Sequence, residues 1–183
     1  MSILFEELSM FPIITGRKIR NAIIGCGRIS KNHFGSIEKH SDNMELAAVC
    51  DNNLEILTAY ADQYKVPAYK NLTELLAESD CDLVTICTPS GLHPQMVIEA
   101  ARAGKHVMTE KPATLSVADW EEMVAVSREC GKILTVHQNR RWDKDYRIMR
   151  EVVESGAIGK VFSIESRVFG TVGAMYGWRA FKA

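Results

Sequence analysis

The tripeptide Glu110-Lys111-Pro112 contains the residues of this chain whose types and position are best suited to chemistry. It follows a short run typical of a β-strand, His106–Thr109, and lies downstream of a glycine-rich loop that begins at Gly25. A lysine ammonium at such a strand end can donate a hydrogen bond to a substrate oxygen and stabilise negative charge there. The tripeptide is expected by chance in many proteins, so its meaning depends on the elements that position it.

Those elements alternate from Lys18 onward between short β-rich runs and amphipathic stretches, which is typical of βαβ units and a parallel sheet. Strands are predicted at Arg20–Gly25, Glu45–Asp51, Ala68–Tyr69, Leu83–Thr88, His106–Thr109 and Ile133–His137. Helices are predicted at Ile29–Lys39, Asn53–Tyr64, Leu72–Ala77, Pro94–Ala103, Val117–Cys130 and Lys144–Ser155. With right-handed crossovers these elements form an α/β, doubly wound parallel sheet, a Rossmann domain.

Several helix boundaries carry physical markers. Pro94 suits a first helical position, and Gly104 and Gly131 suit the residue just past a helix end. Ser116-x-x-Asp119 is close to a capping box, which predicts a helix start at this point.

The segment Lys160–Phe169 is rich in β-formers, alternates in its middle portion and is followed by no helix pattern. We predict that it is the first strand of a second, truncated α/β domain, because the chain ends at Ala183 without partner strands for it. The expected organisation is an N-terminal extension (1–17), the Rossmann domain (18–157) and the start of an incomplete domain (158–183).

The loop Gly25-Cys26-Gly27-Arg28-Ile29-Ser30 follows the first strand and opens the first helix. Gly25 would allow a tight turn, Gly27 would let a pyrophosphate approach the backbone, and the helix N-terminus at Arg28 and Ile29 would offer N–H groups. The third small position is Ser30 instead of glycine or alanine. A plain turn would explain the glycines equally well, but the flanking strand and helix favour a nucleotide loop.

Asp51 ends the second strand, 21 residues after Ser30, where an acidic side chain binds the adenosine ribose hydroxyls in dinucleotide-binding folds. No Lys or Arg occurs from Asp51 to Tyr64, so a 2′-phosphate would meet a carboxylate without a compensating cation. This pattern favours NAD over NADP as the cofactor. The alternative is that Asp51 is a solvated turn residue.

Polar clusters also follow the later strands, at Thr88–His93, Glu110–Pro112 and His137–Trp142. Ligands bind at the carboxyl ends of the strands in open α/β sheets, so these clusters are candidates for one site. His93 is as well explained by helix capping as by ligand contact, and His33 and His40 are expected to be surface or packing residues. No role is assigned to His106 or His137, and no metal site is expected.

Composition excludes several classes of function. The chain has 183 residues, 46% hydrophobic and 25% charged, with a formal net charge of −1, so neither a nucleic-acid partner nor a membrane is indicated. The five cysteines show no CxxC pair, which favours reduced, buried thiols in a cytoplasmic protein over a disulfide framework. Residues 1–15 match neither a signal peptide nor a membrane span.

Taken together, these motifs resemble the Gfo/Idh/MocA family, named for glucose-fructose oxidoreductase, inositol dehydrogenase and a rhizopine-catabolism protein. The resemblance runs from about Lys18 to Arg179 and rests on the glycine loop, Asp51, Thr88–Pro94, Ala103–Val107, Glu110–Pro112 and Asn139–Trp142. It implies an N-terminal Rossmann domain, a C-terminal α/β domain, and an NAD(P)-dependent oxidoreductase that acts on sugars or polyols.

The resemblance also implies roles for individual residues. Lys111 would be catalytic and reach the substrate hydroxyl, and Glu110 would lie with it beside the nicotinamide, with a cis peptide before Pro112. The other implied cofactor contacts are Thr88, Pro89 and His93 along its flank, Asn139 and Arg140 at its nicotinamide end, and the pair Trp178-Arg179.

The expected reaction is hydride transfer between a nicotinamide and a sugar or polyol carbon. Relatives place a catalytic histidine in the second domain, so this chain alone is expected to bind NAD but to be inactive, and an intact protein to form homo-oligomers through that domain. Two alternatives remain: a non-catalytic dinucleotide-binding module or truncated subunit that pairs through Lys160–Phe169, and an NAD-dependent glycosidase. A methyltransferase that uses S-adenosylmethionine would not explain Glu110-Lys111-Pro112.

Overall fold

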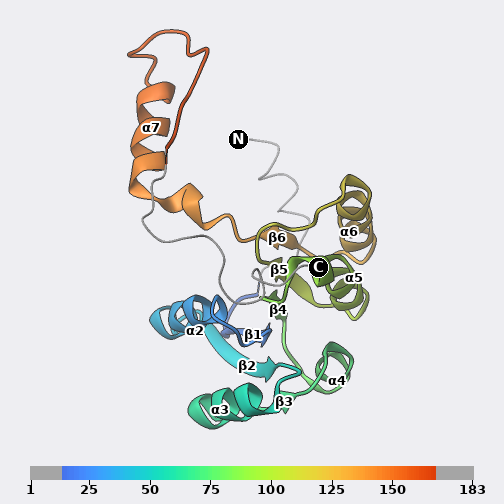
Figure 1. Cartoon of the computed structure of the whole chain (residues 1–183). Coiled ribbons are helices and arrows are strands. Elements are labelled where there is room, and N and C mark those ends of the chain that lie inside the picture. Colours follow the sequence, from blue (N-terminus) through green and yellow to red (C-terminus); the bar gives the residue numbers. More distant parts are fainter. Residues whose placement is uncertain (1–13, 168–183) are drawn as a thin grey trace. The chain divides into compact units, whose positions relative to one another are not determined.

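A computed structural model describes residues 14–167 of the chain. The chain divides into two compact units, residues 1–137 and 138–183, and each is described by itself. The first unit is built on a six-stranded parallel sheet in the order β3-β2-β1-β4-β5-β6 (Figure 1). Its strands are β1 (Ile19–Ile24), β2 (Met44–Cys50), β3 (Ala68–Tyr69), β4 (Leu83–Ile86), β5 (His106–Thr109) and β6 (Leu134–Val136). The doubly wound fold predicted from the sequence is confirmed, with its reversal of strand order between β1 and β4.

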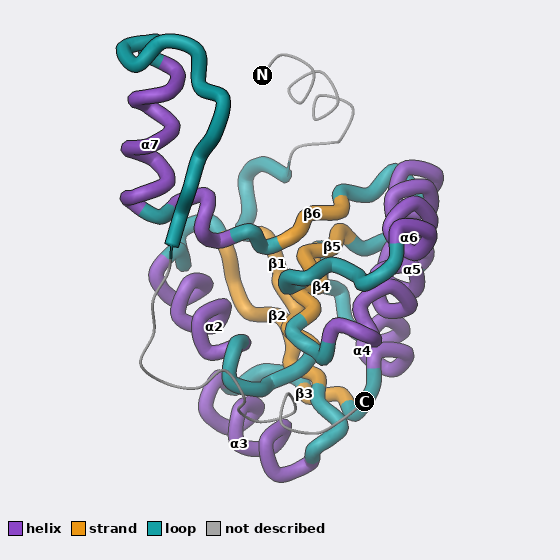
Figure 2. The backbone as a smooth tube through the Cα atoms, turned by 45° about the horizontal axis from the view of Figure 1, so that its top comes forward, coloured by secondary structure: helices purple, strands orange, loops and turns teal. Residues whose placement is uncertain are grey.

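Helices cover both faces of this sheet, as the tube in Figure 2 shows. On one face, Phe34 of α2 (Ser30–Lys39) and Leu57 of α3 (Leu54–Tyr64) form a core cluster with Ile23 of β1. On the other face, the apolar sides of three helices form a second cluster with β1, β4 and β5: α4 (Leu72–Glu78), α5 (His93–Arg102) and α6 (Val117–Glu129). In β1, Ile23 belongs to the first cluster and its neighbours Ala22 and Ile24 belong to the second, as a strand between two helical layers requires.

The helix ends follow the expected chemistry with small shifts. Gly104 and Gly131, just past α5 and α6, have φ of 79° and 63°, the left-handed conformation in which glycine ends helices. The hydroxyl of Ser116 accepts a 3.4 Å hydrogen bond from the Asp119 N–H, but the Asp119 carboxylate contacts Thr114 instead of completing a capping box. Helix α5 begins at His93, one residue before Pro94.

The five cysteines are all free. Cys26, Cys50, Cys81 and Cys87 are buried and belong to the two core clusters, as the sequence predicts, whereas Cys130 is half-buried. Burial raises the pKa of the Cys26 and Cys50 thiols to about 12, so both are protonated at neutral pH.

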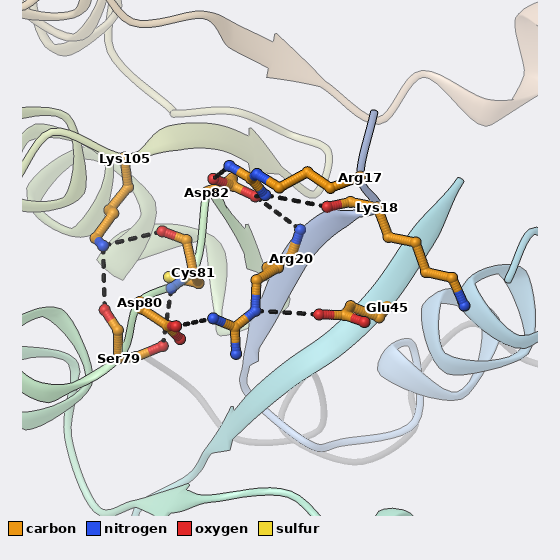
Figure 3. A network of polar contacts seen from close by, with 9 residues as sticks. All are labelled: Arg17, Lys18, Arg20, Glu45, Ser79, Asp80, Cys81, Asp82 and Lys105. Atoms are coloured by element: carbon orange, nitrogen blue, oxygen red, sulfur yellow. Dashed lines mark hydrogen bonds and ion pairs between the residues drawn. The ribbon is translucent and has the colours of Figure 1, made fainter. Parts of the chain in front are cut away.

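An ionic network joins residues at the amino ends of β1, β2 and β4 (Figure 3). Asp82, just before β4, accepts hydrogen bonds of 2.6 and 2.7 Å from the Arg17 guanidinium and 2.9 Å from the Arg20 N–H. Arg20 also pairs with Asp80 and Glu45. The network ties the entry of β1 to the entry of β4.

In the second unit, a 3₁₀ turn (Asn139–Trp142) leads into α7 (Lys144–Glu154). After α7 the chain turns back alongside the helix (Figures 1 and 2). Residues 160–167 form no strand, so the strand predicted at Lys160–Phe169 is wrong for its described part. A strand needs a hydrogen-bonded neighbour, and none of the described residues offers one to this segment. The domain boundary predicted at residue 157 stays a prediction.

Candidate functional site

Strands β1, β2, β4, β5 and β6 end in register at one edge of the sheet. The paired residues are Ile24 with Cys50 and Ile86, Ile86 with Thr109, and Thr109 with Val136. The pairing continues for one residue, because Glu110 donates its N–H to Ile86 O at 2.9 Å and His137 donates to Thr109 O at 2.8 Å. The polar side chains that follow these strands therefore lie in one row, as parallel strands predict.

Gly25 begins the row at a point where a side chain has no room. Its φ is 87°, and a Cβ built on it would lie 2.8 Å from the carbonyl carbon of Cys87 and 2.9 Å from the backbone nitrogen of Thr88. Gly27 is different, because a Cβ there would have no atom within 4 Å. The first glycine is therefore required by the fold, whereas the second leaves open space beside the loop.

The start of α2 lies next to that open space. Ser30 is fully buried and donates its hydroxyl to Gly27 O at 2.6 Å, which shows that a serine fits at the third small position. The side chain of Arg28 is exposed and Ile29 is half-buried against the core. No acidic residue lies in the first turn of α2, so its N–H groups and positive dipole end are available to an anion.

Asp51 is held toward the glycine loop. One carboxylate oxygen accepts the Cys26 N–H at 2.7 Å and the other accepts the Asn53 N–H at 2.8 Å. These bonds fix the orientation of the carboxylate, so Asp51 is not a freely solvated turn residue. Each oxygen keeps a further lone pair with which to accept a hydrogen bond from a ligand hydroxyl.

His93 bridges the loops after β4 and β5. It is 1% exposed, and its ring nitrogens lie 2.9 Å from Thr88 O and 2.9 Å from Pro112 O. Both partners are carbonyl oxygens, so a neutral His93 ring can donate to only one of them at a time, and both of its ring nitrogens face protein atoms. The half-buried Thr88 places its hydroxyl 3.4 Å from the Met96 sulfur, and Pro89 is exposed at this edge. Cofactor contact by Thr88, Pro89 and His93 stays a prediction.

Glu110 forms the centre of a buried cluster with two histidines from other elements. Its Oε1 lies 2.8 Å from His33 Nε2, on α2, and 2.9 Å from His137 Nδ1, just after β6. The side chains of His33 and Glu110 are 8% and 6% exposed, whereas that of His137 is 34% exposed. The second carboxylate oxygen, Oε2, accepts the Lys111 N–H at 3.2 Å.

Glu110 carries a negative charge in this cluster. Burial by itself would raise the pKa of the carboxyl group, but the hydrogen bonds from His33 and His137 outweigh burial and lower the pKa to about 2. An ionised carboxylate only accepts hydrogen bonds, so each histidine must donate to it.

Lys111 extends from this cluster into solvent. The Lys111–Pro112 peptide is cis, as the family resemblance implied. The lysine is exposed, and no described residue forms a hydrogen bond or ion pair with its ammonium group. The ammonium therefore stands at the ligand edge without a fixed partner among residues 14–167.

Comparison with known proteins agrees with this geometry. The family model described as an oxidoreductase family with an NAD-binding Rossmann fold, GFO_IDH_MocA, matches residues 19–138. The chain belongs to the Gfo/Idh/MocA oxidoreductase family.

Similar proteins in this family include curated and solved examples. The chain is 36% identical to the myo-inositol 2-dehydrogenase of Thermotoga maritima, covering 81% of this chain and 45% of that protein. It is 30% identical to the D-glucoside 3-dehydrogenase of Escherichia coli, covering 94% of this chain and 49% of that protein. The WlbA dehydrogenase of Chromobacterium violaceum, solved with NADH and UDP-GlcNAcA, matches with 42% identity and a TM-score of 0.79 over 81% of this chain and 43% of its own. The chain thus spans about half the length of the relatives it matches.

The structure does not test the cofactor contacts that the resemblance assigned to four further residues. Asn139 and Arg140 are exposed in the second unit, where Arg140 pairs with Asp143 at 3.0 Å. Trp178 and Arg179 lie outside the described residues. The roles of all four stay predictions. Among the described helices, none is long and apolar enough to cross a membrane.

His33 and His137 both contact the Glu110 carboxylate, which was not predicted from the sequence. His33 was expected to be a surface or packing residue, but it is buried and bonded to Glu110, whereas His40 is exposed. Its position shows a signal in hindsight, because Ser30, His33, Phe34 and Ile37 form the buried stripe of α2 at helical spacing. His137 follows the strand next to the one that Glu110 ends.

The same three side chains were also not foreseen as a group that could hold a metal. Within residues 14–167, His33, Glu110 and His137 offer ligand atoms that lie within 4.8 Å of one another, and two histidines with a glutamate form a known zinc ligand set. The hydrogen-bond distances to a single oxygen account for the arrangement without an ion.

Proposed function

We propose that this chain is the cofactor-binding part of an NAD-dependent oxidoreductase that transfers a hydride between the nicotinamide and a hydroxyl-bearing carbon of a sugar or polyol. The observation that carries the proposal is the row of in-register strand ends, which brings the glycine loop, Asp51 and Glu110-Lys111 to one edge. The names of the relatives, an inositol dehydrogenase and a glucoside dehydrogenase, support the substrate class.

Each part of this edge has a task in the proposed reaction. The open backbone at Gly27 and the N-terminus of α2 bind the pyrophosphate, and the Asp51 carboxylate accepts hydrogen bonds from the adenosine ribose hydroxyls. The Lys111 ammonium donates to the substrate oxygen and stabilises charge that develops on it. A bound nicotinamide supplies the two-electron acceptor for the substrate carbon.

Asp51 selects NAD over NADP in this proposal. The carboxylate is fixed by Cys26 and Asn53, and no Lys or Arg lies between Asp51 and Tyr64 to neutralise a 2′-phosphate. A 2′-phosphate beside the Asp51 carboxylate would bring two negative charges close together, and they would repel each other.

Titration calorimetry of the chain with NAD⁺ and NADP⁺ tests the cofactor half of the proposal. The wild-type chain should bind NAD⁺ more tightly than NADP⁺. Asp51→Asn should reduce the affinity for NAD⁺ and also the difference between the affinities for the two dinucleotides. Asn52→Ala is the matched control, because Asn52 is exposed and its side chain forms no hydrogen bond with the described residues. A folded wild-type chain that binds neither dinucleotide would refute the proposal.

A second candidate function is a non-catalytic dinucleotide-binding module. It is favoured by the exposed Lys111, whose ammonium has no fixed partner among the described residues. In a protein that carries this chain together with a second domain, NADH absorbance during incubation with NAD⁺ and a panel of sugars and polyols separates the two functions. NAD⁺ binding without NADH formation would favour the module, and release of a cleaved sugar would favour the glycosidase alternative.

A further inference from the structure

His137 differs from the other two members of the buried cluster in its exposure. About a third of its side chain is exposed, at 34%, whereas the side chains of His33 and Glu110 are 8% and 6% exposed. The three come from different elements, α2, the end of β5 and the end of β6. The cluster is therefore buried on the helix side and open on the side of His137.

Hydrogen bonding to Glu110 fixes the tautomer of His137. The ionised carboxylate can only accept, so the 2.9 Å contact to His137 Nδ1 places the proton of a neutral ring on Nδ1. The other nitrogen, Nε2, then carries a lone pair and no proton. No described residue forms a hydrogen bond with Nε2.

The sheet fixes the backbone position of His137 relative to Glu110 and Lys111. Thr109 and Val136 are paired residues, so His137 and Glu110 follow adjacent strands at the same level, and Lys111 comes one residue later. A carboxylate that orients a histidine through Nδ1–H while Nε2 stays free is the arrangement by which enzymes make histidine a base.

We propose that His137 is a proton acceptor of the dehydrogenase site, oriented by Glu110 and acting through Nε2. The inference rests on the proposed function. In the oxidation, the substrate O–H bond breaks and its proton bonds to Nε2, while the carbinol carbon loses its C–H hydride to the oxidised nicotinamide and becomes a carbonyl. Lys111 donates a hydrogen bond to the same oxygen throughout and keeps its protons.

His33 holds the Glu110 carboxylate in place for its contact with His137. Its Nε2–H donates to the oxygen that His137 uses, so Glu110 Oε1 is held from two sides and cannot turn away from His137. Because His33 lies on α2, the contact also links the helix after the glycine loop to the strand end that carries Lys111. In this proposal His33 is a positioning residue, and His137 is the residue that accepts the substrate proton.

The tautomer can be measured on the chain as it stands, by long-range ¹H–¹⁵N correlation of its histidine rings. At neutral pH, His137 should show a proton on Nδ1 and a bare Nε2, and Glu110→Ala should shift it toward the Nε2–H form that free histidine favours. His106 is the internal control, because its Nδ1 accepts the Ile133 N–H at 3.1 Å and its ring must stay in the Nε2–H form in both proteins. A proton on Nε2 of His137 in the wild type would overturn the proposal.

Modification by diethyl pyrocarbonate tests whether Nε2 faces the cofactor edge. His137 should react, the buried His33 should not, and saturating NAD⁺ should slow the reaction of His137 while leaving that of the exposed His40 unchanged. Calorimetry on the same sample separates the two hypotheses. No NAD⁺ binding would sink the proposed function, whereas NAD⁺ binding without protection of His137 would sink the inference alone.

The third test measures kcat in a protein that carries this chain and reduces NAD⁺ with a sugar or polyol. His137→Asn should lower kcat by about 100-fold or more, the usual contribution of a general base, with NAD⁺ affinity unchanged. Equal kcat in the variant and the wild type would overturn the proposal.

Discussion

Gly25 is a residue whose identity is imposed by its neighbours before any ligand is considered. A Cβ at this position would lie 2.8 Å from backbone atoms of Cys87, and φ is 87°. Backbone atoms cannot move aside as a flexible side chain can, so Gly25→Ala would push β1 and β4 apart at the ligand edge. We predict that Gly25→Ala lowers the free energy of unfolding by about 1–3 kcal/mol, measured by urea denaturation, and abolishes NAD⁺ binding.

Gly27→Ala provides the matched comparison two residues later. A Cβ at this position would have no atom within 4 Å and its φ is not in the left-handed range, so the free energy of unfolding should change by less than about 0.5 kcal/mol. NAD⁺ affinity should still fall, because the new methyl group occupies the space through which a pyrophosphate reaches the backbone. Equal destabilisation by both substitutions would contradict the different roles assigned to the two glycines.

Single residues could be predicted from the sequence where one physical rule acts at one position. The glycine loop, Asp51 and the Glu110–Pro112 segment all followed from the rule that parallel strands present their carboxyl ends to a ligand. The partners of Glu110 were harder to predict, because His33 lies 77 residues away and meets it only when α2 packs on the sheet. His33 was expected to be a surface or packing residue, and only in hindsight does its place on the buried stripe of α2 indicate that it needs a partner.

The short helix α4 shows how an element depends on the residue that caps its start. The Asn71 side chain accepts the Glu74 N–H at 2.9 Å and donates to the Glu74 carboxylate at 2.8 Å, while the Lys70 N–H donates to that carboxylate at 3.2 Å. Such reciprocal bonds satisfy N–H groups that a helix leaves unpaired at its start.

Asn71→Ala should therefore lower the free energy of unfolding by about 1 kcal/mol, as the loss of a helix cap does, and chemical denaturation would measure it. Asn43→Ala is the control, because Asn43 is exposed and its side chain forms no hydrogen bond with the described residues. If the two substitutions cost the same, α4 does not depend on its cap.

Elements were predictable when their pattern and their neighbours agreed. The strands of the first unit combine apolar runs with partners on the sheet, and all six formed close to the predicted ranges. The segment from Lys160 has the same β-rich pattern, yet its described part forms no strand. A β-rich pattern alone does not make a strand, because the hydrogen bonds that define a strand require a neighbouring chain segment as partner.

Across the first unit, ionised carboxylates hold both ends of the sheet. At the amino ends, hydrogen bonding from the Arg17 guanidinium lowers the pKa of Asp82, and at the carboxyl ends the two histidines lower that of Glu110 to about 2. A carboxyl whose pKa is lower in the folded than in the unfolded chain stabilises the fold only while it is ionised. Both ends should therefore weaken on acidification.

The sign and the pH window follow from these shifts. In the unfolded chain Glu110 has its ordinary pKa of 4.5, so its contribution is complete above that pH and is lost as the pH falls through the folded value of about 2. Glu110→Gln should thus cost on the order of 2–3 kcal/mol of unfolding free energy at pH 7 and progressively less between about pH 5 and pH 2. Urea denaturation across this range measures the difference, with exposed Glu121→Gln as the control that should show almost no change. A deficit in Glu110→Gln that stays constant down to pH 2 would mean that the side chain stabilises the sheet by its shape, and that its charge contributes nothing.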